Sequence, residues 1–495
     1  MTSADLIALS PLIALAGLSI VTMLGIAVHR GHAVTAGLSV LACVLTFATL
    51  PWAAGVAPRA VTTLLIIDRY ALLYMGLFLA ATIAVIAWSY GYLAVHVEDL
   101  EEREEFYLLL LLGTLGALVL SASAHLVSFF LGIELIGVSL YSLIGYLRAR
   151  RAPLEAAMKY LLLSGSASAF LLFGMALLYF DAGGMSFRDL GAGSFGRGAG
   201  PLRTAGVVLI LVGVGFKIGL VPFHLWMPDV YQGAPAPVTA YVATVSKGAV
   251  FALLLRFVTD LQVGQSAALG HLLALLAAGS MIAGNLLALL QTNVKRLLAY
   301  SSIAHFGYAL VALLAGGPVA AEAVTFYLTA YFVMTLAAFG VVTLQSDGQR
   351  DADEFEDYRG LFWSRPWLAA AFMLALLSLA GIPVTVGFVG KFYAIAAGVD
   401  AGLWLLVFLL VANSAVGVYY YLRLIVILFE QPAPVRGPLL VTVNPAAWTA
   451  ALSLGLVVSL LLWLGGYPQP FIEVIRDAVT GVGTMVGVSR LAPPP

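Results

Sequence analysis

Two long apolar stretches of the sequence each carry a single lysine near the middle, and a proline-rich stretch separates the two lysines. The lysines, Lys217 and Lys247, lie within residues 206–256, and the sixteen residues 222–237 contain four prolines. A charged side chain at the centre of a bilayer costs at least about 2.5–3.5 kcal/mol. Proline removes a backbone donor and breaks a helix, and a break within a membrane is tolerated only where protein or water covers the freed groups. The stretch therefore predicts the lining of a wet ion path.

The composition indicates that the whole chain is built for a membrane. Hydrophobic residues make up 62% of the 495 residues and charged residues only 10%, whereas an ordinary soluble domain carries roughly 25% charged residues. The single cysteine, Cys43, excludes a disulfide framework and any iron–sulfur or zinc cluster held by cysteines. The net charge of −1 argues against a nucleic-acid partner. We expect an all-α polytopic membrane protein.

Fourteen apolar segments are long enough for a spanning helix, which needs roughly 20 residues at about 1.5 Å per residue. Basic residues favour one set of loops, including the cluster RARR at 148–151, so the positive-inside rule predicts an N-terminus that faces outward. The fourteen helices are expected near residues 5–28, 33–54, 70–95, 106–123, 125–147, 153–180, 203–231, 237–259, 267–290, 297–315, 320–345, 366–398, 402–429 and 444–467.

The seventh and twelfth segments share an interrupted pattern. One contains GFKIGLVP and the other GIPVTVGFVGK, each with glycine, proline and one lysine. Paired broken segments in two halves of a chain indicate inverted repeats around a transport site. We expect breaks near Lys217–Pro222 and Gly381–Lys391. The chain would then divide into helices one to three (1–105), a first five-helix repeat (106–260), a second, inverted repeat (261–430), and a fourteenth helix with a tail (431–495).

Lysine is used sparingly, and mostly inside apolar segments. Of the five lysines only Lys295 has a loop-like setting, and the other four are Lys159, Lys217, Lys247 and Lys391. A buried amine can lose its proton, whereas a guanidinium cannot. The choice of lysine at these depths favours proton transfer.

Glu134 is the one acidic residue deep within an apolar run, in FFLGIELIGVSL. An intramembrane carboxylate is by default a candidate functional group that needs a partner. Segments five and seven would place Glu134 and Lys217 at comparable depth, so we expect these two residues to pair. The alternative is that Glu134 is a structural clamp between helices.

Two further residues are candidates with open alternatives. His305 lies in AYSSIAHFGYAL beside two serines and is interpreted as a proton relay, although it could be a satisfied core histidine. Lys159 lies six residues after Pro153, at a shallower depth, where a lysine can instead extend its amine to the membrane surface. With Glu134, Lys217, Lys247 and Lys391, these residues complete the candidate set.

Signatures of bound cofactors are missing from the sequence. It contains no Walker A loop, no GxGxxG after a strand and no cysteine cluster. We therefore expect no flavin, nicotinamide, iron–sulfur or metal centre on this chain.

Four motifs, in order, resemble a known family. The motifs are VPFHLWMPDVYQGAPAPVTAYVATVSKGAVFALLLR from Val221, LAYSSIAHFGY from Leu298, GIPVTVGFVGKFY from Gly381 and YYYLRLIV from Tyr419. Together they resemble the antiporter-like membrane subunits of the proton-pumping NADH:quinone oxidoreductase, complex I, and the ATVSK form is similar to the subunit N family. The likeness covers about residues 65–430.

The resemblance implies both a function and a set of site residues. It implies fourteen helices, two inverted repeats with broken helices seven and twelve, and proton translocation driven by electron transfer elsewhere. Glu134 and Lys217 match the family's glutamate–lysine pair, Lys247 its connecting lysine, and Lys391 the lysine of the second half-channel. FMN, iron–sulfur clusters, NADH and quinone would belong to partner subunits. Neighbouring antiporter-like subunits, lipid, protons and water would be the partners, in a bacterial cytoplasmic membrane.

Two other readings remain open on the sequence, and a third fails. The chain could belong to a multi-subunit sodium/proton antiporter, whose subunits share this fold, or to a proton-pumping membrane hydrogenase. It could also be an inert membrane scaffold, but a scaffold predicts no buried charges and fails on Glu134 and the lysines.

Overall fold

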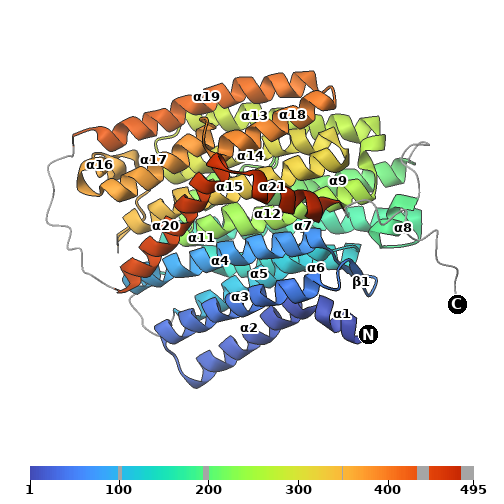
Figure 1. Cartoon of the computed structure of the whole chain (residues 1–495), viewed down its shortest axis with the longest axis horizontal. Coiled ribbons are helices and arrows are strands. Elements are labelled where there is room, and N and C mark those ends of the chain that lie inside the picture. The colour runs from blue at the N-terminus through green and yellow to red at the C-terminus, as the bar shows by residue number, and fades with distance from the viewer. Residues whose placement is uncertain (98–102, 193–199, 348, 432–444, 481–495) are drawn as a thin grey trace.

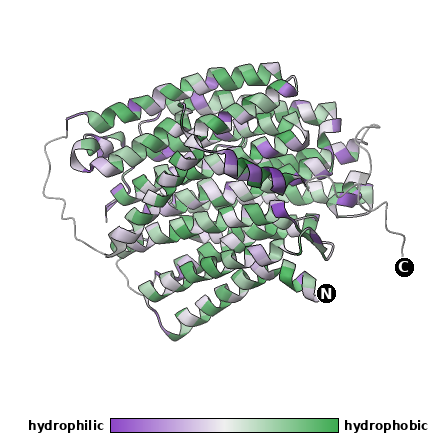
Figure 2. Cartoon of the chain, viewed as in Figure 1, coloured by the Kyte–Doolittle hydropathy of each residue, from purple (hydrophilic) through white to green (hydrophobic). Residues whose placement is uncertain are grey.

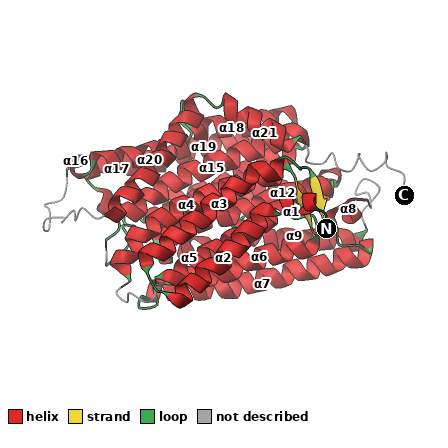
Figure 3. Ribbon diagram, turned by 60° about the horizontal axis from the view of Figure 1, so that its bottom comes forward, coloured by secondary structure: helices red, strands yellow, loops and turns green. Residues whose placement is uncertain are grey.

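The computed structural model describes residues 1–97, 103–192, 200–347, 349–431 and 445–480, and these ranges are almost entirely helical (Figures 1 and 3). Most of the helices run along one common direction. The elements are α1 (Ser3–Ala8), α2 (Ser10–Val28), α3 (His32–Ala54), β1 (Arg59–Val61), β2 (Leu65–Ile67), α4 (Arg69–His96), α5 (Glu104–Ala122), α6 (Leu126–Ile144), α7 (Arg151–Ala182), α8 (Phe187–Ala192), α9 (Pro201–Ile218), α10 (Trp226–Gly233), α11 (Ala236–Tyr241), η3 (Val242–Ser246), α12 (Lys247–Asp260), η4 (Val263–Gln265), α13 (Ala267–Leu289), α14 (Val294–Ala315), α15 (Gly317–Gln345), η5 (Phe355–Tyr358), α16 (Leu361–Ser364), α17 (Pro366–Ala380), α18 (Val386–Asp400), α19 (Trp404–Phe429), α20 (Pro445–Gly466) and α21 (Gln469–Val479).

The bundle has the dimensions and polarity of a membrane protein. Within the described ranges, thirteen helices are long and apolar enough to cross a membrane, and the shorter apolar α17 adds to them. Hydrophobic residues cover the helix surfaces, and hydrophilic residues gather toward the helix ends and on α21 (Figure 2). Each of the fourteen predicted segments corresponds to a helix or to a helix in two parts. The prediction of an all-α polytopic membrane protein is confirmed.

The two ends of the bundle differ, and we name them by their elements. The hairpin face carries the β1–β2 hairpin, α8 and the start of α4, and it lies at the right of Figure 1. The loop face carries α16 and residues 351–360, and it lies at the left. The predicted C-terminal unit, 431–495, is described only at residue 431 and over 445–480, where an amphipathic helix, α21, follows α20.

Helices seven and twelve are broken, and both breaks begin with the same glycine cap. Gly219 and Gly381 have φ values of +83° and +82°, a region that glycine enters without steric cost. The N–H groups of Gly219 and Leu220 reach back to carbonyls of α9, and those of Gly381 and Ile382 reach back to α17 in the same pattern. Such a cap satisfies the last carbonyls of a helix that stops inside the bundle.

The second break is shorter than predicted, and the two lysines lie on opposite sides of their breaks. Regular helix resumes at Trp226 in helix seven and at Val386 in helix twelve. Lys217 therefore precedes its break in α9, whereas Lys391 follows its break inside α18. The expectation that the break extends to Lys391 is wrong, because Thr385 caps α18 by accepting from the N–H of Phe388.

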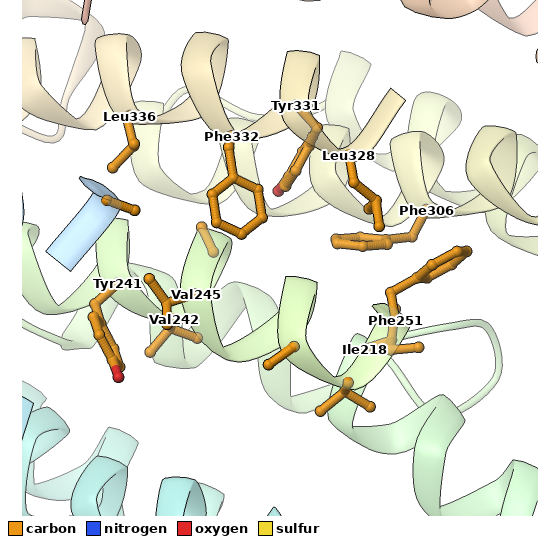
Figure 4. Close-up of a cluster of buried hydrophobic side chains, with 14 of the residues drawn as sticks. Ile218, Tyr241, Val242, Val245, Phe251, Phe306, Leu328, Tyr331, Phe332 and Leu336 are labelled. Carbon is orange, nitrogen blue, oxygen red and sulfur yellow. The ribbon is translucent and has the colours of Figure 1, made fainter. Parts of the chain in front are cut away.

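The eighth helix runs through the middle of the protein. The most apolar part of the span Ala236–Asp260 is fully buried, and that of α15 is 94% buried. Side chains of η3 and α12 interdigitate with those of α14 and α15, and Phe332 points into the layer between them (Figure 4). Gly248 lies so close to the ring of Phe332 that a methyl group there has no room. Lys247, at the junction of η3 and α12, is thus surrounded by protein rather than by lipid.

Candidate functional site

Glu134 contacts a serine and not the lysine that the sequence assigned to it. It lies on α6, is half-buried, and its Oε1 accepts a hydrogen bond from Oγ of Ser168 on α7 at 2.5 Å. Among the described residues, neither Glu134 nor Lys217 has an oppositely charged partner within 4.0 Å. The two side chains thus form no direct ion pair, each has a serine of α7 as its hydrogen-bond partner, and their functional pairing stays a prediction.

Lys217 occupies the last turn of α9 and is buried. Its Nζ donates to Oγ of Ser164 on α7 at 2.7 Å, and that oxygen lies 2.9 Å from the hydroxyl of Tyr141 on α6. A methyl group on Gly137 of α6 would lie 3.3 Å from Nζ of Lys217. Close approach of α6, α7 and α9 thus encloses the amine in hydroxyl groups.

Lys247 follows the π-helical stretch η3 and is fully buried. Its Nζ donates to Oγ of Ser302 on α14 at 2.9 Å, contacts Sδ of Met227, and lies 5.2 Å from the ring centre of Tyr231. A methyl group on Gly219 would lie 3.6 Å from this Nζ. The amine therefore reaches the start of the first break, two residues beyond Lys217.

His305 lies one turn beyond Ser302 on α14, within a group of tyrosines. Its Nδ1 is 2.6 Å from the hydroxyl of Tyr327, and its Nε2 is 3.5 Å from that of Tyr421. The hydroxyl of Tyr331 is 2.6 Å from Oγ of Ser302. Every polar atom of the imidazole thus has a hydroxyl partner, so the ring has a proton donor or acceptor on each side.

Lys391 is held by the end of a helix. Its Nζ donates to the carbonyls of Leu379 and Ala380 at 3.0 and 2.8 Å and to Oγ of Ser414 at 2.9 Å. Both carbonyls belong to the last turn of α17, where the helix dipole favours a cation. The amine also lies 5.6 Å from the ring centre of Tyr308, one turn beyond His305 on α14.

The three residues Lys247, His305 and Lys391 border a single short stretch of α14. Their contacts on that helix, Ser302 to Tyr308, span about 9 Å along its axis at 1.5 Å per residue. Lys217 lies two residues before Gly219, which the amine of Lys247 approaches. Glu134 contacts Ser168 of α7, and Lys217 contacts Ser164 of the same helix. The structure thus brings five of the six candidates into one band through the middle of the bundle.

The sixth candidate, Lys159, lies apart from this band. Its side chain is 43% exposed, toward the loop-face end of α7, and pairs with Glu155 at 2.7 Å and Asp229 at 2.8 Å. Asp229 also pairs with Arg296 at 2.7 Å. Lys159 therefore belongs to a charged cluster on the approach to the band.

Lys295 does not lie in a loop, contrary to the sequence interpretation. It is the second residue of α14, its side chain is 1% exposed, and its Nζ donates to Asp351 at 2.6 Å and to the carbonyl of Ala234 at 2.7 Å. The hydroxyl of Tyr92 also donates to Asp351. The acidic segment 351–360 thus folds back onto the bundle and covers this lysine.

Sequence reasoning missed the hydroxyl groups that contact the amines. Ser164, Ser302 and Ser414 each accept from a central lysine. The pattern LSGSAS in the sixth predicted helix was the available signal for the first of these. Among the described residues, no group of three or more His, Cys, Asp or Glu side chains could hold a metal ion.

An all-helical bundle with two broken helices and lysines beside the breaks defines the antiporter-like class of membrane subunits. The chain belongs to the NADH:quinone oxidoreductase/Mrp antiporter transmembrane family, whose model matches residues 123–417.

Within that family, two relatives that are half identical to this chain carry the same subunit name. A relative from Ectopseudomonas mendocina, called NADH-quinone oxidoreductase subunit N, is 50% identical over 96% of this chain and 97% of its own length. One of the same name from Methylococcus capsulatus is 50% identical over 96% and 95%. A chain of respiratory complex I from Thermus thermophilus superposes with a TM-score of 0.80 at 36% identity, over 94% of this chain and all of that one. The chain thus falls in the subunit N family, and the resemblance drawn from its motifs is confirmed.

Proposed function

We propose that the chain is a proton-translocating subunit of the membrane arm of a respiratory NADH:quinone oxidoreductase. The observation that carries the proposal is the band of buried amines and imidazole from Lys217 to Lys391, each in contact with a hydroxyl group. Such groups can take up, hold and release protons, and a buried cation is too costly to keep without a role. Oxidation of NADH and reduction of quinone, with FMN and iron–sulfur clusters, would occur in partner subunits.

The order of the groups suggests how protons are held along the band. The amine of Lys247 approaches Gly219, two residues beyond Lys217, and Ser302 joins Lys247 to the tyrosine group around His305. Lys391 then sits on the carbonyl end of α17, where its protonated form is well supported. Charges a few ångströms apart interact strongly in a low-dielectric interior. A proton arriving at one amine therefore disfavours a proton on the next.

Lys159 and Glu134 extend the proposal toward the surface. Lys159, with Asp229, lies between the loop face and the band and would pass protons inward. Glu134 would set the charge state of Lys217 through the hydroxyl groups of α7, which makes the two a switch rather than a stabilising bridge. A buried ion pair is in any case weak support for stability.

We also propose the two-repeat division and an orientation. Residues 106–260 and 261–430 would be the two repeats, supported by the break in the fourth helix of each and by the matching caps at Gly219 and Gly381. Residues 1–105 and 431–495 would flank them. The loop face carries the RARR cluster, so this face would point to the cytoplasm and the N-terminus to the outside of a bacterial cytoplasmic membrane. Apolar side chains on the outer helix surfaces would contact lipid and neighbouring membrane-arm subunits.

Substitutions at Lys217 and Glu134 test the proposal. In purified complexes reconstituted into vesicles, Lys217→Ala, Lys217→Arg and Glu134→Ala should each impair NADH-driven proton uptake while the complex still assembles. Arginine keeps the charge but holds its proton, so Lys217→Arg separates a proton-releasing role from a purely electrostatic one. Full pumping by assembled Lys217→Arg complexes would contradict the proposal.

A further inference from the structure

The sixth membrane helix, α7, supplies a hydroxyl neighbour both to the carboxylate of Glu134 and to the amine of Lys217. α7 packs against α6, which carries Glu134, and against α9, which carries Lys217 (Figure 3). Ser164 and Ser168 on this helix are both buried. Ser168 donates to Glu134 at 2.5 Å, and Ser164 accepts from Lys217 at 2.7 Å. Each ion therefore meets a hydroxyl of the same helix.

The spacing of the two serines places them on one face of α7. Residues four apart on a helix are neighbours, with about 5–6 Å between their Cβ atoms. A third serine in the same stretch, Ser166, has a different setting, since it is exposed and donates to the carbonyl of Leu162 at 3.1 Å. The sequence LSGSAS thus contains two serines that face the ions and one that does not.

We propose that Ser164 and Ser168 are the positioning residues through which Glu134 and Lys217 act on one another. This inference rests on the proposed function, because it concerns the same pair. A hydroxyl both donates and accepts, so Ser168 can stabilise the carboxylate while Ser164 accepts from the ammonium. Hydrogen bonds to ionised groups are roughly twice as strong as neutral ones.

The hydroxyls also tie the two charge states together. When Glu134 takes up a proton, Ser168 loses a charged acceptor, and its hydroxyl becomes free to turn toward Ser164. When Lys217 releases its proton, Ser164 loses its charged donor and relies on Tyr141, 2.9 Å away. Rotation of hydroxyl groups on one helix face thus replaces the direct ion pair that the sequence predicted.

The test is a set of serine variants in the assembled complex. Ser164→Ala and Ser168→Ala should each lower the proton-pumping rate at least fivefold, while Ser166→Ala, the matched control on the same helix, should pump normally. Ser168→Thr keeps the hydroxyl and should restore pumping. Ser164→Cys replaces the hydroxyl with a somewhat larger thiol that is a weak donor and acceptor, and should therefore behave like Ser164→Ala rather than like the native chain.

A coupling measurement separates positioning from packing. If the serines connect Glu134 and Lys217, Glu134→Gln should reduce pumping in the native chain but add little in a Ser164→Ala/Ser168→Ala chain. The pH profile of pumping should shift to the same extent in the Glu134→Gln chain and in the Ser164→Ala/Ser168→Ala chain. Independent, multiplicative effects, or normal pumping by both alanine variants, would overturn the inference. Normal pumping by Lys217→Arg would overturn the proposed function itself, so the two failures can be told apart.

Discussion

Replacing Gly381 with alanine should disconnect Lys391 from the end of α17. Gly381 has φ +82°, and a methyl group there would lie 2.8 Å from Cδ and 3.0 Å from Nζ of Lys391. Both distances are shorter than a normal contact, and the lysine end is the flexible partner. We therefore expect the amine to move away from the carbonyls of Leu379 and Ala380, to which it donates at 3.0 and 2.8 Å.

Two costs contribute to this change, and a control separates them. A side chain in the left-handed region costs about 1–2 kcal/mol. Each lost hydrogen bond to a charged group costs about 1.5–3 kcal/mol. The population of the conformation in which Lys391 contacts the two carbonyls should therefore fall roughly tenfold to hundredfold. Gly402 has φ +70° with open space around its Cβ position, so Gly402→Ala carries only the first cost.

The assay is proton pumping by reconstituted complexes, with thermal stability measured in parallel. Gly381→Ala should lose more stability than Gly402→Ala, because it carries both costs, and only Gly381→Ala should lose proton pumping, by at least tenfold. If the two variants pump equally well, contact between Gly381 and Lys391 does not set the position of the amine, and the role assigned to the second break is wrong.

Two further predictions concern buried ion pairs away from the band. Arg256 donates to both oxygens of Asp68 at 2.8 Å, and both side chains are nearly buried. Arg256→Met should lower the unfolding free energy by about 3–5 kcal/mol, because it leaves the carboxylate buried without its partner, and adding Asp68→Asn should recover part of that loss. Thermal unfolding of the single and double variants measures both effects. Lys295→Met should likewise lower the unfolding free energy, because it leaves the carboxylate of Asp351 without its lysine, and adding Asp351→Asn should recover part of the loss in the same measurement. Strictly additive losses of stability in either pair would contradict the reasoning.

The helices and the breaks could be predicted because their signals are local. Apolar runs of spanning length gave each helix within a few residues, and glycine followed by proline placed both interruptions. The depth of Glu134 and Lys217 could be estimated from residue counts along their helices. Their contacts with Ser168 and Ser164 could not, because these depend on how α6, α7 and α9 pack together.

Lys295 shows the same limit at a helix end. The sequence placed it between two apolar runs, and the loop interpretation followed. Asn293 caps α14 by accepting from the N–H of Arg296 at 3.0 Å, and an asparagine there is a recognisable helix-start signal. The burial of Lys295 depends on Asp351, 56 residues later, and no local pattern indicates that contact.

The π-helical stretch has a consequence for how this protein can vary. Val242–Ser246 directly precede Lys247 in a helix enclosed by protein. A π turn holds one residue more than an α turn, and each residue of an α-helix advances the chain by about 100°. Deleting one residue here would restore a regular helix and rotate Lys247 away from Ser302, or rotate Ala236–Tyr241 instead. The direction in which Lys247 points therefore depends on how many residues precede it in the eighth helix. Inserting or deleting a residue there would move this amine farther than a substitution would.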